Sequence, residues 1–400
     1  MSKNISTKRI GIDARFYGPM GKGLGRYTQE VVDNIIIIDE DNEYVVFLTK
    51  DNFDEFETDN PRVKKVITNI RCYSLAEQVL FPFIIARERL DLIHFPHFNV
   101  PLFLNTKFVV TIHDLILTKF PTTRASTLSP CLYKLKNLAY RTVISSAVRR
   151  SKKIITVSSF TKKDLVDKFK VDASKIIVTY EGVANLAKGN DSLLGSKISS
   201  HRTIVDYNLG DRFLLYVGNA YPHKNLNSLV EVFERLHRDY SDLKLVLVGK
   251  EDYFYNRLKE FTFEKSLWRE GEESPVIFTG YVLDVELEIL FKKALLYIFP
   301  SFYEGFGLPP LEAMAKKCPV ISSDKASLPE ILGDAAIYFD PYNKDDMYEK
   351  IKETMFNNEL KEELIEKGLE QIKKYNWWEC ALVTLNVYKQ VLRVKYEEKE

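Results

Sequence analysis

A short apolar strand followed by glycines, prolines and two glutamates decides the fold: residues 296–312 are LYIFPSFYEGFGLPPLE. Leu296–Phe299 is continuously apolar, as expected of a strand buried on both faces of a parallel sheet. Gly305 and Gly307 expose backbone N–H groups, and Pro310 suits the first turn of a helix. The stretch therefore predicts a strand, a ligand-binding turn and a helix, which is the repeating element of a doubly wound α/β domain.

The same pattern recurs in two series along the chain. The first series predicts strands at Ile10–Ile12, Tyr44–Leu48, Val63–Ile67, Leu92–Phe95, Phe108–Ile112 and Ile154–Val157. The second series predicts strands at Phe213–Val217, Leu243–Val248, Val276–Phe278, Leu296–Phe299, Val320–Ser322 and Ala336–Phe339. Two consecutive series favour an α/β protein of two doubly wound, Rossmann-like domains facing across a cleft, and that cleft is the expected site.

A segment rich in Gly, Ser, Asn and Lys from Gly182 to about Ser200 separates the two series. We place the domain boundary there, which gives an N-terminal domain of residues 1–195 and a C-terminal domain of residues 196–376. Residues 377–400 are expected to form a C-terminal helix that crosses back toward the N-terminal domain.

Length and composition exclude several classes of protein. The chain has 400 residues, 45% of them hydrophobic and 28% charged, which is ordinary for a globular protein and argues against disorder, collagen-like repeats and a disulfide scaffold. Its four cysteines form no CxxC pair, which disfavours structural zinc and fits a reducing compartment. The polar N-terminus has no apolar signal core, and no apolar run is long enough to span a bilayer. We therefore expect an intracellular protein that is soluble or rests on a membrane.

Charge is distributed unevenly along the chain. Residues 1–195 carry 29 Lys/Arg against 21 Asp/Glu, a net charge of +8, while the remaining residues carry −7. Between Leu115 and Lys163 there are 11 Lys/Arg and no Asp or Glu. Two interpretations stay open for this basic stretch: contact with an anionic membrane or a lipid-diphosphate acceptor, and a solvated helix face.

A glycine-rich loop, Gly21-Lys22-Gly23-Leu24-Gly25-Arg26-Tyr27, lies between the first strand and the first helix. Glycines let the backbone approach a ligand, and the N-terminus of a helix favours anions, so Gly23 and Gly25 are candidates to cradle a phosphate. The loop matches neither GxGxxG nor a Walker motif. The alternative is a tight turn that needs positive φ.

Charged residues follow three other strands. His113, with Asp114, comes after the strand at 108–112, where a hydrogen-bonded structural histidine is the alternative to a site residue. Lys224 lies just before a helix, an unfavourable end of the helix dipole for a cation unless the lysine binds an anion there. Glu304 and Glu312 flank the glycine turn and, together with its bare amides, suit a polyol attached to a phosphate. The alternatives are a solvated surface lysine for Lys224 and, for Glu312, a first-turn acid that stabilises the helix dipole.

Together these residues resemble the retaining glycosyltransferases of family 4, which have the GT-B fold. The signature is EGFGLPPLEAM, in which seven residues separate Glu304 from Glu312. The stretches that agree run in order from about Ile10 to about Leu392 and are GIDARFYGPMGKGLGRY, VVTIHDLILTKFP, ITVSSFTKKDL, LLYVGNAYPHKNL, FTGYVLDVEL and VISSDKASLPEILGDAAIYFDP.

The resemblance implies a role for each matching residue. Glu304 would lie beside the transferred sugar, whose hydroxyls would contact the backbone amides of Phe306 and Gly307, and His113 would reach the same sugar. Glu312 would bind the ribose, and residues 280–282 would cover the base. Lys224 would hold the donor diphosphate, as would the loop around Gly23 and Gly25. Asn219 and Leu308 complete the donor-binding set. Many family members place an arginine near this lysine, whereas here Asn219 follows Gly218 and His223 precedes Lys224, so Arg26 or His223 would have to assist.

The resemblance also implies a function. The chain is expected to be a retaining, metal-independent hexosyltransferase of EC class 2.4. It would move mannose or glucose from a nucleotide-diphosphate sugar to a saccharide or lipid-linked acceptor in cell-surface polysaccharide, glycolipid or lipopolysaccharide synthesis. No tightly bound cofactor and no nucleic-acid partner are expected. The expected location is the cytoplasm, with possible peripheral contact at the inner face of an anionic membrane. The alternatives are a sugar phosphorylase or epimerase of the same fold and a non-catalytic partner of another transferase.

Overall fold

The computed structural model describes residues 7–120, 130–183, 209 and 212–393. The chain divides into two compact units, here called unit 1 and unit 2. Unit 1 comprises Met1–Thr118, Leu128–Gly182 and Asn376–Glu400, and unit 2 comprises Lys119–Thr127 and Val183–Tyr375. The predicted boundary at residue 195 falls outside the described residues. The assignment of Lys119–Thr127 to unit 2 was not anticipated, because this segment lies between two strands of unit 1 in the sequence.

Unit 1 is built on a seven-stranded parallel sheet with the order β3-β2-β1-β4-β5-β6-β7. Its strands are β1 (Arg9–Asp13), β2 (Glu43–Leu48), β3 (Val63–Ile67), β4 (Leu92–Phe95), β5 (Phe108–Ile112), β6 (Lys153–Thr156) and β7 (Ile176–Val178). Its helices are α1 (Lys22–Ile38), α2 (Leu75–Arg87), α3 (Ile116–Lys119), α4 (Pro130–Arg150), α5 (Ser159–Phe169) and α13 (Trp377–Arg393).

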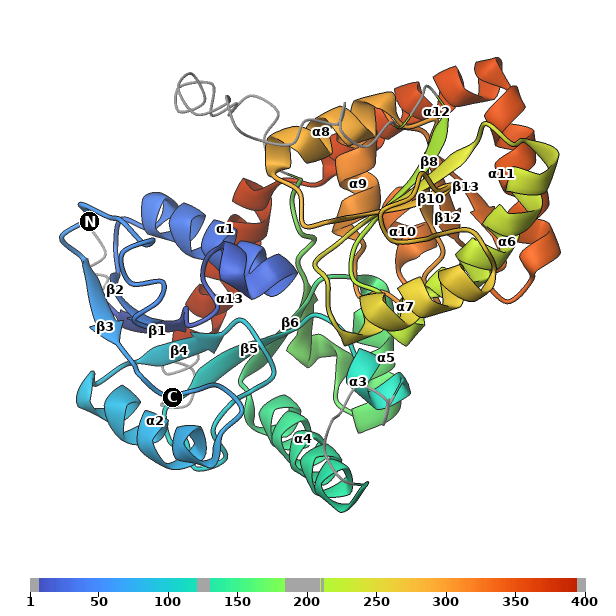
Figure 1. The fold of residues 1–400 in the computed structure, drawn as a ribbon. Coiled ribbons are helices and arrows are strands. Elements are labelled where there is room, and N and C mark those ends of the chain that lie inside the picture. The colour runs from blue at the N-terminus through green and yellow to red at the C-terminus, as the bar shows by residue number, and fades with distance from the viewer. Residues whose placement is uncertain (1–6, 121–129, 184–208, 210–211, 394–400) are drawn as a thin grey trace. The chain divides into compact units, whose positions relative to one another are not determined.

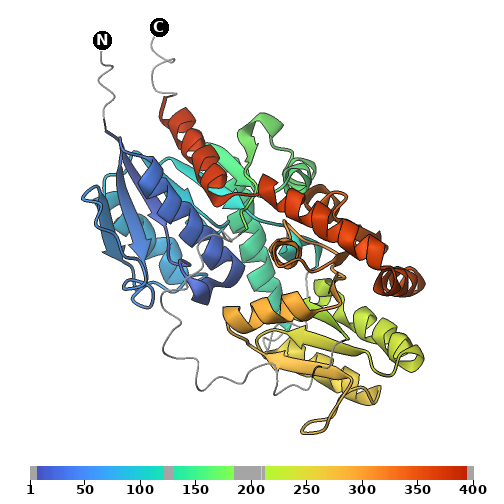
Figure 2. The same cartoon turned by 90° about the horizontal axis from the view of Figure 1, so that it is seen from above.

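Helices cover both faces of the unit 1 sheet. On one face, α2, α4 and α5 pack into a single apolar core with the sheet, to which they contribute Phe81, Ile144 and Leu165, respectively. On the other face, α13 lies beside α1 (Figure 1 and Figure 2). The C-terminal helix is also tied to the sheet by a hydrogen bond of 2.6 Å between Tyr388 Oη and His94 Nδ1.

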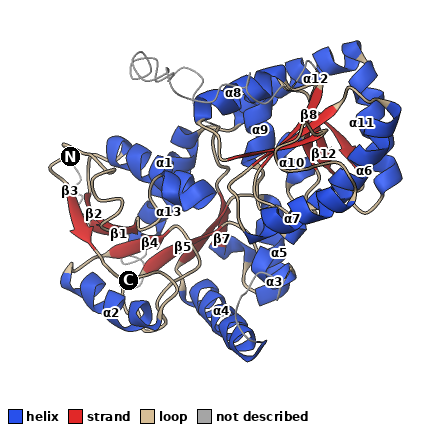
Figure 3. Cartoon of the chain, in the orientation of Figure 1, coloured by secondary structure: helices blue, strands red, loops and turns tan. Residues whose placement is uncertain are grey.

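Unit 2 is built on a six-stranded parallel sheet with the order β10-β9-β8-β11-β12-β13. Its strands are β8 (Phe213–Val217), β9 (Lys244–Val248), β10 (Val276–Gly280), β11 (Leu296–Phe299), β12 (Val320–Ser323) and β13 (Ala336–Phe339). Its helices are α6 (Leu226–Asp239), α7 (Tyr253–Glu264), α8 (Asp284–Lys293), α9 (Leu308–Ala315), α10 (Leu328–Leu332), α11 (Lys344–Phe356) and α12 (Asn358–Gln371), and they flank the sheet as Figure 3 shows.

The predicted class of two doubly wound α/β domains is confirmed. All twelve predicted strands are present, six of them with the predicted bounds and the others displaced by one or two residues at an end. The short strand β7 was not predicted. Ser158 caps the N-terminus of α5, because its side-chain hydroxyl accepts a hydrogen bond from the Thr161 N–H.

The strand orders place the ligand-binding edges. In unit 2 the chain order reverses between β8 and β11, and in unit 1 it reverses between β1 and β4. In open α/β sheets, ligands bind beyond the carboxyl ends of the strands at such a switch point. In unit 2 these ends are Val217 and Phe299, so the loops that follow them form the candidate site.

Candidate functional site

An ion pair joins the two loops at the switch point of unit 2. Lys224 closes a short 3-10 turn, Pro222–Lys224, in the loop after β8, and Glu304 lies in the loop after β11. Lys224 Nζ lies 2.6 Å from Glu304 Oε1, and the two side chains are only 12% and 9% exposed. The position of Lys224 just before a helix predicts an anionic partner. Glu304, 80 residues further along the chain, is that partner.

The backbone around Lys224 is held in a specific turn. Asn225, which precedes α6, has φ of 59° in the left-handed region that asparagine tolerates better than most residues. Its side-chain amide is buried and donates to the carbonyl of Pro341 over 3.0 Å. The turn therefore presents Lys224 from a fixed backbone.

Ser327 fixes the loop that carries Glu304. Its hydroxyl is fully buried and lies 3.0 Å from the carbonyl oxygen of Glu304 and 2.9 Å from that of Phe306. Phe306 is itself buried and packs edge-on against Tyr375, with ring centroids 5.5 Å apart. Because both contacts reach backbone carbonyls, they set the direction of the Glu304–Gly305 and Phe306–Gly307 peptide groups.

Gly307 begins α9 in a conformation that requires glycine. Its φ is 110°, and an added Cβ would lie 2.9 Å from Leu328 Cδ2. Leu308 is the first residue of α9 and two prolines follow it, which suits a turn whose N–H groups have no partners within the helix. Because Pro309 and Pro310 carry no N–H, the start of α9 offers the amides of Gly307 and Leu308 at the same edge as Lys224.

The position of Glu312 differs from the expectation of a first-turn acid. It is the fifth residue of α9 (Leu308–Ala315), in the second turn, and is half-buried. Pro310 lies in the first turn as expected, but the helix begins at Leu308, which places Glu312 one turn further along. Interpreting Glu312 only as an acid that stabilises the helix dipole is therefore wrong.

His223 and Asn219 replace the arginine that many family members carry. His223 is 6% exposed, and burial together with the Lys224 charge lowers its pKa to about 4, so it is neutral near pH 7. Asn219 lies in the turn after β8, where its carbonyl accepts a hydrogen bond of 2.8 Å from Tyr216 Oη. Of these three residues, Lys224 alone is a cation at neutral pH.

In unit 1, Gly23 and Gly25 lie in the first turn of α1 and serve different purposes. Neither has a positive φ, so the expected alternative of a positive-φ turn is wrong; in this loop Gly18 has that conformation, with φ of 93°. An added Cβ at Gly25 would lie 2.1 Å from the Gly18 carbonyl oxygen, whereas one at Gly23 would meet nothing within 4 Å. The packing of this turn therefore requires glycine at position 25, whereas a Cβ at position 23 would meet no neighbouring atom within 4 Å.

His113, at the carboxyl end of β5 in unit 1, contacts two acceptors. Its Nε2 lies 2.9 Å from the Pro96 carbonyl oxygen and its Nδ1 lies 3.2 Å from Glu181 Oε1. Both partners accept, so both ring nitrogens carry protons when both bonds are made. Burial alone would lower the pKa of His113, but the hydrogen bond and charge of Glu181 outweigh burial and raise it.

Sequence reasoning missed Glu181 and Ser327, the residues that position His113 and Glu304. Each lies far along the chain from its partner, 68 residues for Glu181 and 23 residues for Ser327. Both fall within stretches that end a strand or begin a helix, TYEG and ASLPE, but no spacing rule connects them to the residues they hold.

Two family models match the chain. The model described as Glycosyltransferase Family 4 matches residues 22–184, and the model described as Glycosyl transferases group 1 matches residues 198–371. The chain belongs to glycosyltransferase family 4. The family that the ordered motifs resemble is thereby confirmed, and the protein is a glycosyltransferase.

One relative and two solved structures match this glycosyltransferase over nearly its whole chain. O-antigen chain mannosyltransferase B of Escherichia coli is 28% identical over 385 residues, covering 92% of this chain and 96% of that protein. Sucrose-phosphate synthase of Thermosynechococcus elongatus matches with a TM-score of 0.71 at 19% identity, covering 97% and 100% of the two chains. HepE of Anabaena, in complex with UDP and glucose, matches with a TM-score of 0.68 at 16% identity, covering 96% and 99%. The fold is therefore GT-B, as expected.

Two substitutions test the loop support in this glycosyltransferase. Ser327→Ala removes the hydroxyl that contacts the Glu304 and Phe306 carbonyls, so we expect unfolding to need about 1 kcal/mol less free energy and turnover to fall several-fold. The matched control is Ser301→Ala, in the loop after β11 that also carries Glu304. The Ser301 hydroxyl is buried and has no hydrogen-bond partner in the described structure. Equal effects of the two substitutions on turnover would contradict the assigned role of Ser327.

The pair of His113 and Glu181 predicts a pH dependence. Because the folded-state pKa of His113 is raised, its interaction stabilises the fold fully below about pH 6.5 and is lost as pH rises through the raised value. In Glu181→Gln, the ring should deprotonate at lower pH, and the loss of thermal stability should be larger at pH 6 than at pH 9. Titration of the His113 ring by NMR, with the resonance assigned from its absence in His113→Gln, measures the shift. An unchanged midpoint would show that Glu181 does not hold the proton.

Proposed function

We propose that this glycosyltransferase transfers a hexose, mannose in preference to glucose, from a nucleotide-diphosphate sugar, and that it retains the anomeric configuration without a metal ion. The observation that carries the proposal is the Lys224–Glu304 pair at the switch point of unit 2, beside the amides that begin α9. Mannose is favoured because one relative, whose match covers 92% of this chain, is an O-antigen chain mannosyltransferase.

In this proposal, the Lys224–Glu304 pair separates when the donor binds. The diphosphate takes the Lys224 ammonium, whose charge, with the α9 amides, stabilises the leaving phosphate as the bond to the sugar breaks. Glu304 is then left as a carboxylate acceptor for hydroxyls of the transferred sugar, which also contact the Phe306 and Gly307 amides. Glu312 accepts from the ribose. The leaving phosphate accepts the proton of the attacking acceptor hydroxyl, so no covalent intermediate is needed.

The remaining donor contacts are proposed from the resemblance to the family. Asn219 and Leu308 border the phosphate site, while Gly23 and Gly25 in unit 1 offer the N-terminus of α1 to the diphosphate. His113 contacts the sugar as a cation held by Glu181. Because His223 is neutral, the electrostatic attraction for the diphosphate on unit 2 depends mainly on Lys224.

The acceptor is proposed to be a saccharide or lipid-linked saccharide bound on unit 1, in the synthesis of a cell-surface polysaccharide or glycolipid. Within the described residues, no helix combines the length and apolar character needed to cross a bilayer. We propose that unit 1 makes peripheral contact with an anionic membrane through basic residues between 115 and 163.

A donor panel tests the proposal. Thermal unfolding in the presence of GDP-mannose, UDP-glucose and other nucleotide sugars should show selective stabilisation, about 2.7 kcal/mol when the donor is at 100 times its dissociation constant. Release of nucleoside diphosphate with an acceptor extract should follow the same order of donors. Sugar release that needs phosphate but no nucleotide would favour a phosphorylase, and tight nucleotide binding without turnover would favour a non-catalytic partner.

A further inference from the structure

We propose that the outer side of α2, the adjoining loop and α4 form a docking surface for an anionic lipid bilayer. This α2–α4 surface comprises Leu75, Val79, Leu80 and Phe83 of α2, Phe103 of the loop between β4 and β5, and Leu135 and Leu138 of α4. The inference deepens the membrane contact proposed above and rests on it, because it names the face of unit 1 that meets the lipid.

The helix α2 is apolar on both sides. Phe81 and Ile85 are fully buried in the core of unit 1. On the outer side, Leu75 is 87% exposed, Val79 55% and Phe83 65%. These three residues follow one another at intervals of four and therefore form one stripe along the helix. The core does not explain this second stripe, since an ordinary surface helix is polar on the side away from the sheet.

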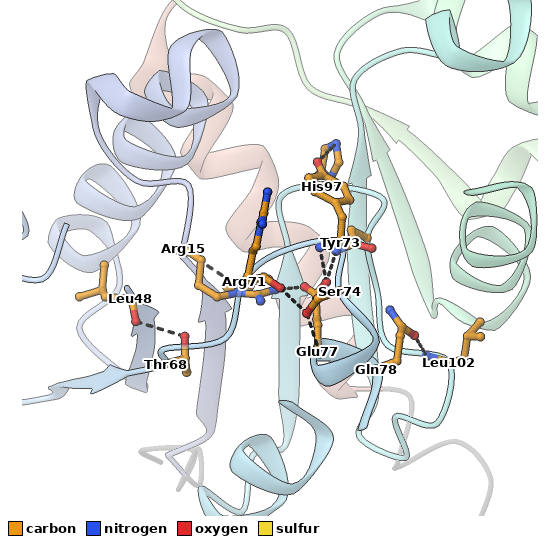
Figure 4. Close-up of polar contacts among 12 residues, drawn as sticks. Arg15, Leu48, Thr68, Arg71, Tyr73, Ser74, Glu77, Gln78, His97 and Leu102 are labelled. Atoms are coloured by element: carbon orange, nitrogen blue, oxygen red, sulfur yellow. Dashed lines mark hydrogen bonds and ion pairs between the residues drawn. The ribbon is translucent and has the colours of Figure 1, made fainter. Parts of the chain in front are cut away.

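The loop that carries Phe103 is attached to both helices. Gln78 of α2 accepts a hydrogen bond of 2.9 Å from the Leu102 N–H, a contact drawn in Figure 4. Arg150, the last residue of α4, donates to the carbonyls of Leu102 and Leu104. Phe103, which lies between these anchored residues, is 75% exposed. Its aromatic ring is thus displayed by a fixed loop beside the apolar stripe of α2.

The charge of this region fits a bilayer of anionic lipids. Between Leu92 and Lys163 there are 12 Lys/Arg and a single acid, Asp114. The acid within α2, Glu77, is fully buried and paired with Arg15 over 2.6 Å (Figure 4), so it does not reach the outer side. The exposed cations on the two helices and just before α2 are Arg71, Arg87, Lys134, Lys136, Arg141, Arg149 and Arg150.

Apolar side chains bordered by cations match the acyl region and the phosphate region of a lipid surface. The leucines and phenylalanines would enter the acyl boundary while the cations meet the phosphates, each cation strengthening binding about fivefold. A second copy of this chain is a poorer occupant, since a two-fold contact would bring the same cations face to face. The surface thus favours lipid over self-association.

Vesicle sedimentation of the full chain tests the inference without any donor. We expect binding to vesicles of phosphatidylcholine with about one third phosphatidylglycerol, and at least tenfold weaker binding to phosphatidylcholine alone. Val79→Ser/Phe83→Ser should lower the partition coefficient at least tenfold. The matched control is Ile37→Ser, because Ile37 is 64% exposed on α1, on the other face of the sheet. Lys134→Glu/Lys136→Glu tests the charge separately, and thermal unfolding confirms that each variant is folded.

The outcomes separate this inference from the proposed function. Donor turnover with a soluble acceptor should be unchanged in all these variants. Three results would each overturn the docking surface while leaving the transferase proposal intact. The wild-type protein could fail to bind anionic vesicles, or the apolar variants could bind them as well as Ile37→Ser does. The third result is a wild-type dimer that the apolar substitutions dissociate. Vesicle binding without turnover of any donor would instead contradict the transferase proposal.

Discussion

Replacing Lys224 by methionine should reduce donor turnover by about 100-fold to 1,000-fold, since it removes the cation that stabilises the leaving diphosphate. The substitution should also destabilise the fold. The Glu304 carboxylate is 9% exposed and would lose the partner that lies 2.6 Å away. Breaking a buried pair from one side costs about 3–5 kcal/mol, and the slight exposure of this pair places the cost at the lower end.

The double variant Lys224→Met/Glu304→Gln separates the two effects. Removing both charges avoids an unpaired buried carboxylate, so chemical denaturation should show most of the stability restored. Turnover should remain as low as in Lys224→Met, because the cation is still absent. If the double variant regained turnover along with stability, the loss in the single variant would be a folding effect and not a loss of diphosphate stabilisation.

Alanine at Gly25 is expected to destabilise the protein by about 2–4 kcal/mol, because its Cβ would meet the Gly18 carbonyl oxygen at 2.1 Å and backbone cannot move aside cheaply. Alanine at Gly23, two residues earlier in the same helical turn, meets nothing within 4 Å and should leave stability unchanged or raise it by up to about 1 kcal/mol. Urea unfolding of the two variants measures this difference.

The same pair of variants tests the ligand role proposed for the loop. If Gly23 borders the donor diphosphate, Gly23→Ala should raise the KM for the donor with no loss of stability. Comparable stability of the two variants would contradict the packing assigned to Gly25. An unchanged KM in Gly23→Ala would remove Gly23 from the donor site.

Elements with a strong local pattern could be predicted from the sequence. Short runs such as Phe108–Ile112 belong to strands buried on both faces, and their shortness and β-branched residues identify them. In the predicted C-terminal helix, Ala381, Leu385, Tyr388 and Leu392 share one side by helical spacing; the first three are buried and Leu392 is half-buried.

Contacts between distant segments could not be predicted. The position of Lys224 and of Glu304 after a predicted strand indicates two residues of a site. Their direct pairing depends on β8 and β11 being neighbours, which only the strand order shows. The same holds for Ser327, since a buried serine in a polar stretch has no signal in the sequence until the backbone carbonyls it meets are known. Glu312 was expected in the first turn and lies in the second for a local reason, because prolines at 309 and 310 are compatible with more than one first turn.

The stoichiometry of the transfer reaction tests the central claim most directly. Purified protein, the preferred nucleotide sugar and its acceptor should yield one nucleoside diphosphate for each hexose that mass spectrometry finds on the acceptor. Glu304→Gln should lower both products together. A protein that binds nucleotide sugars but transfers no hexose, or whose transfer is unaffected by removal of Lys224 and of the Glu304 carboxylate, would contradict the account.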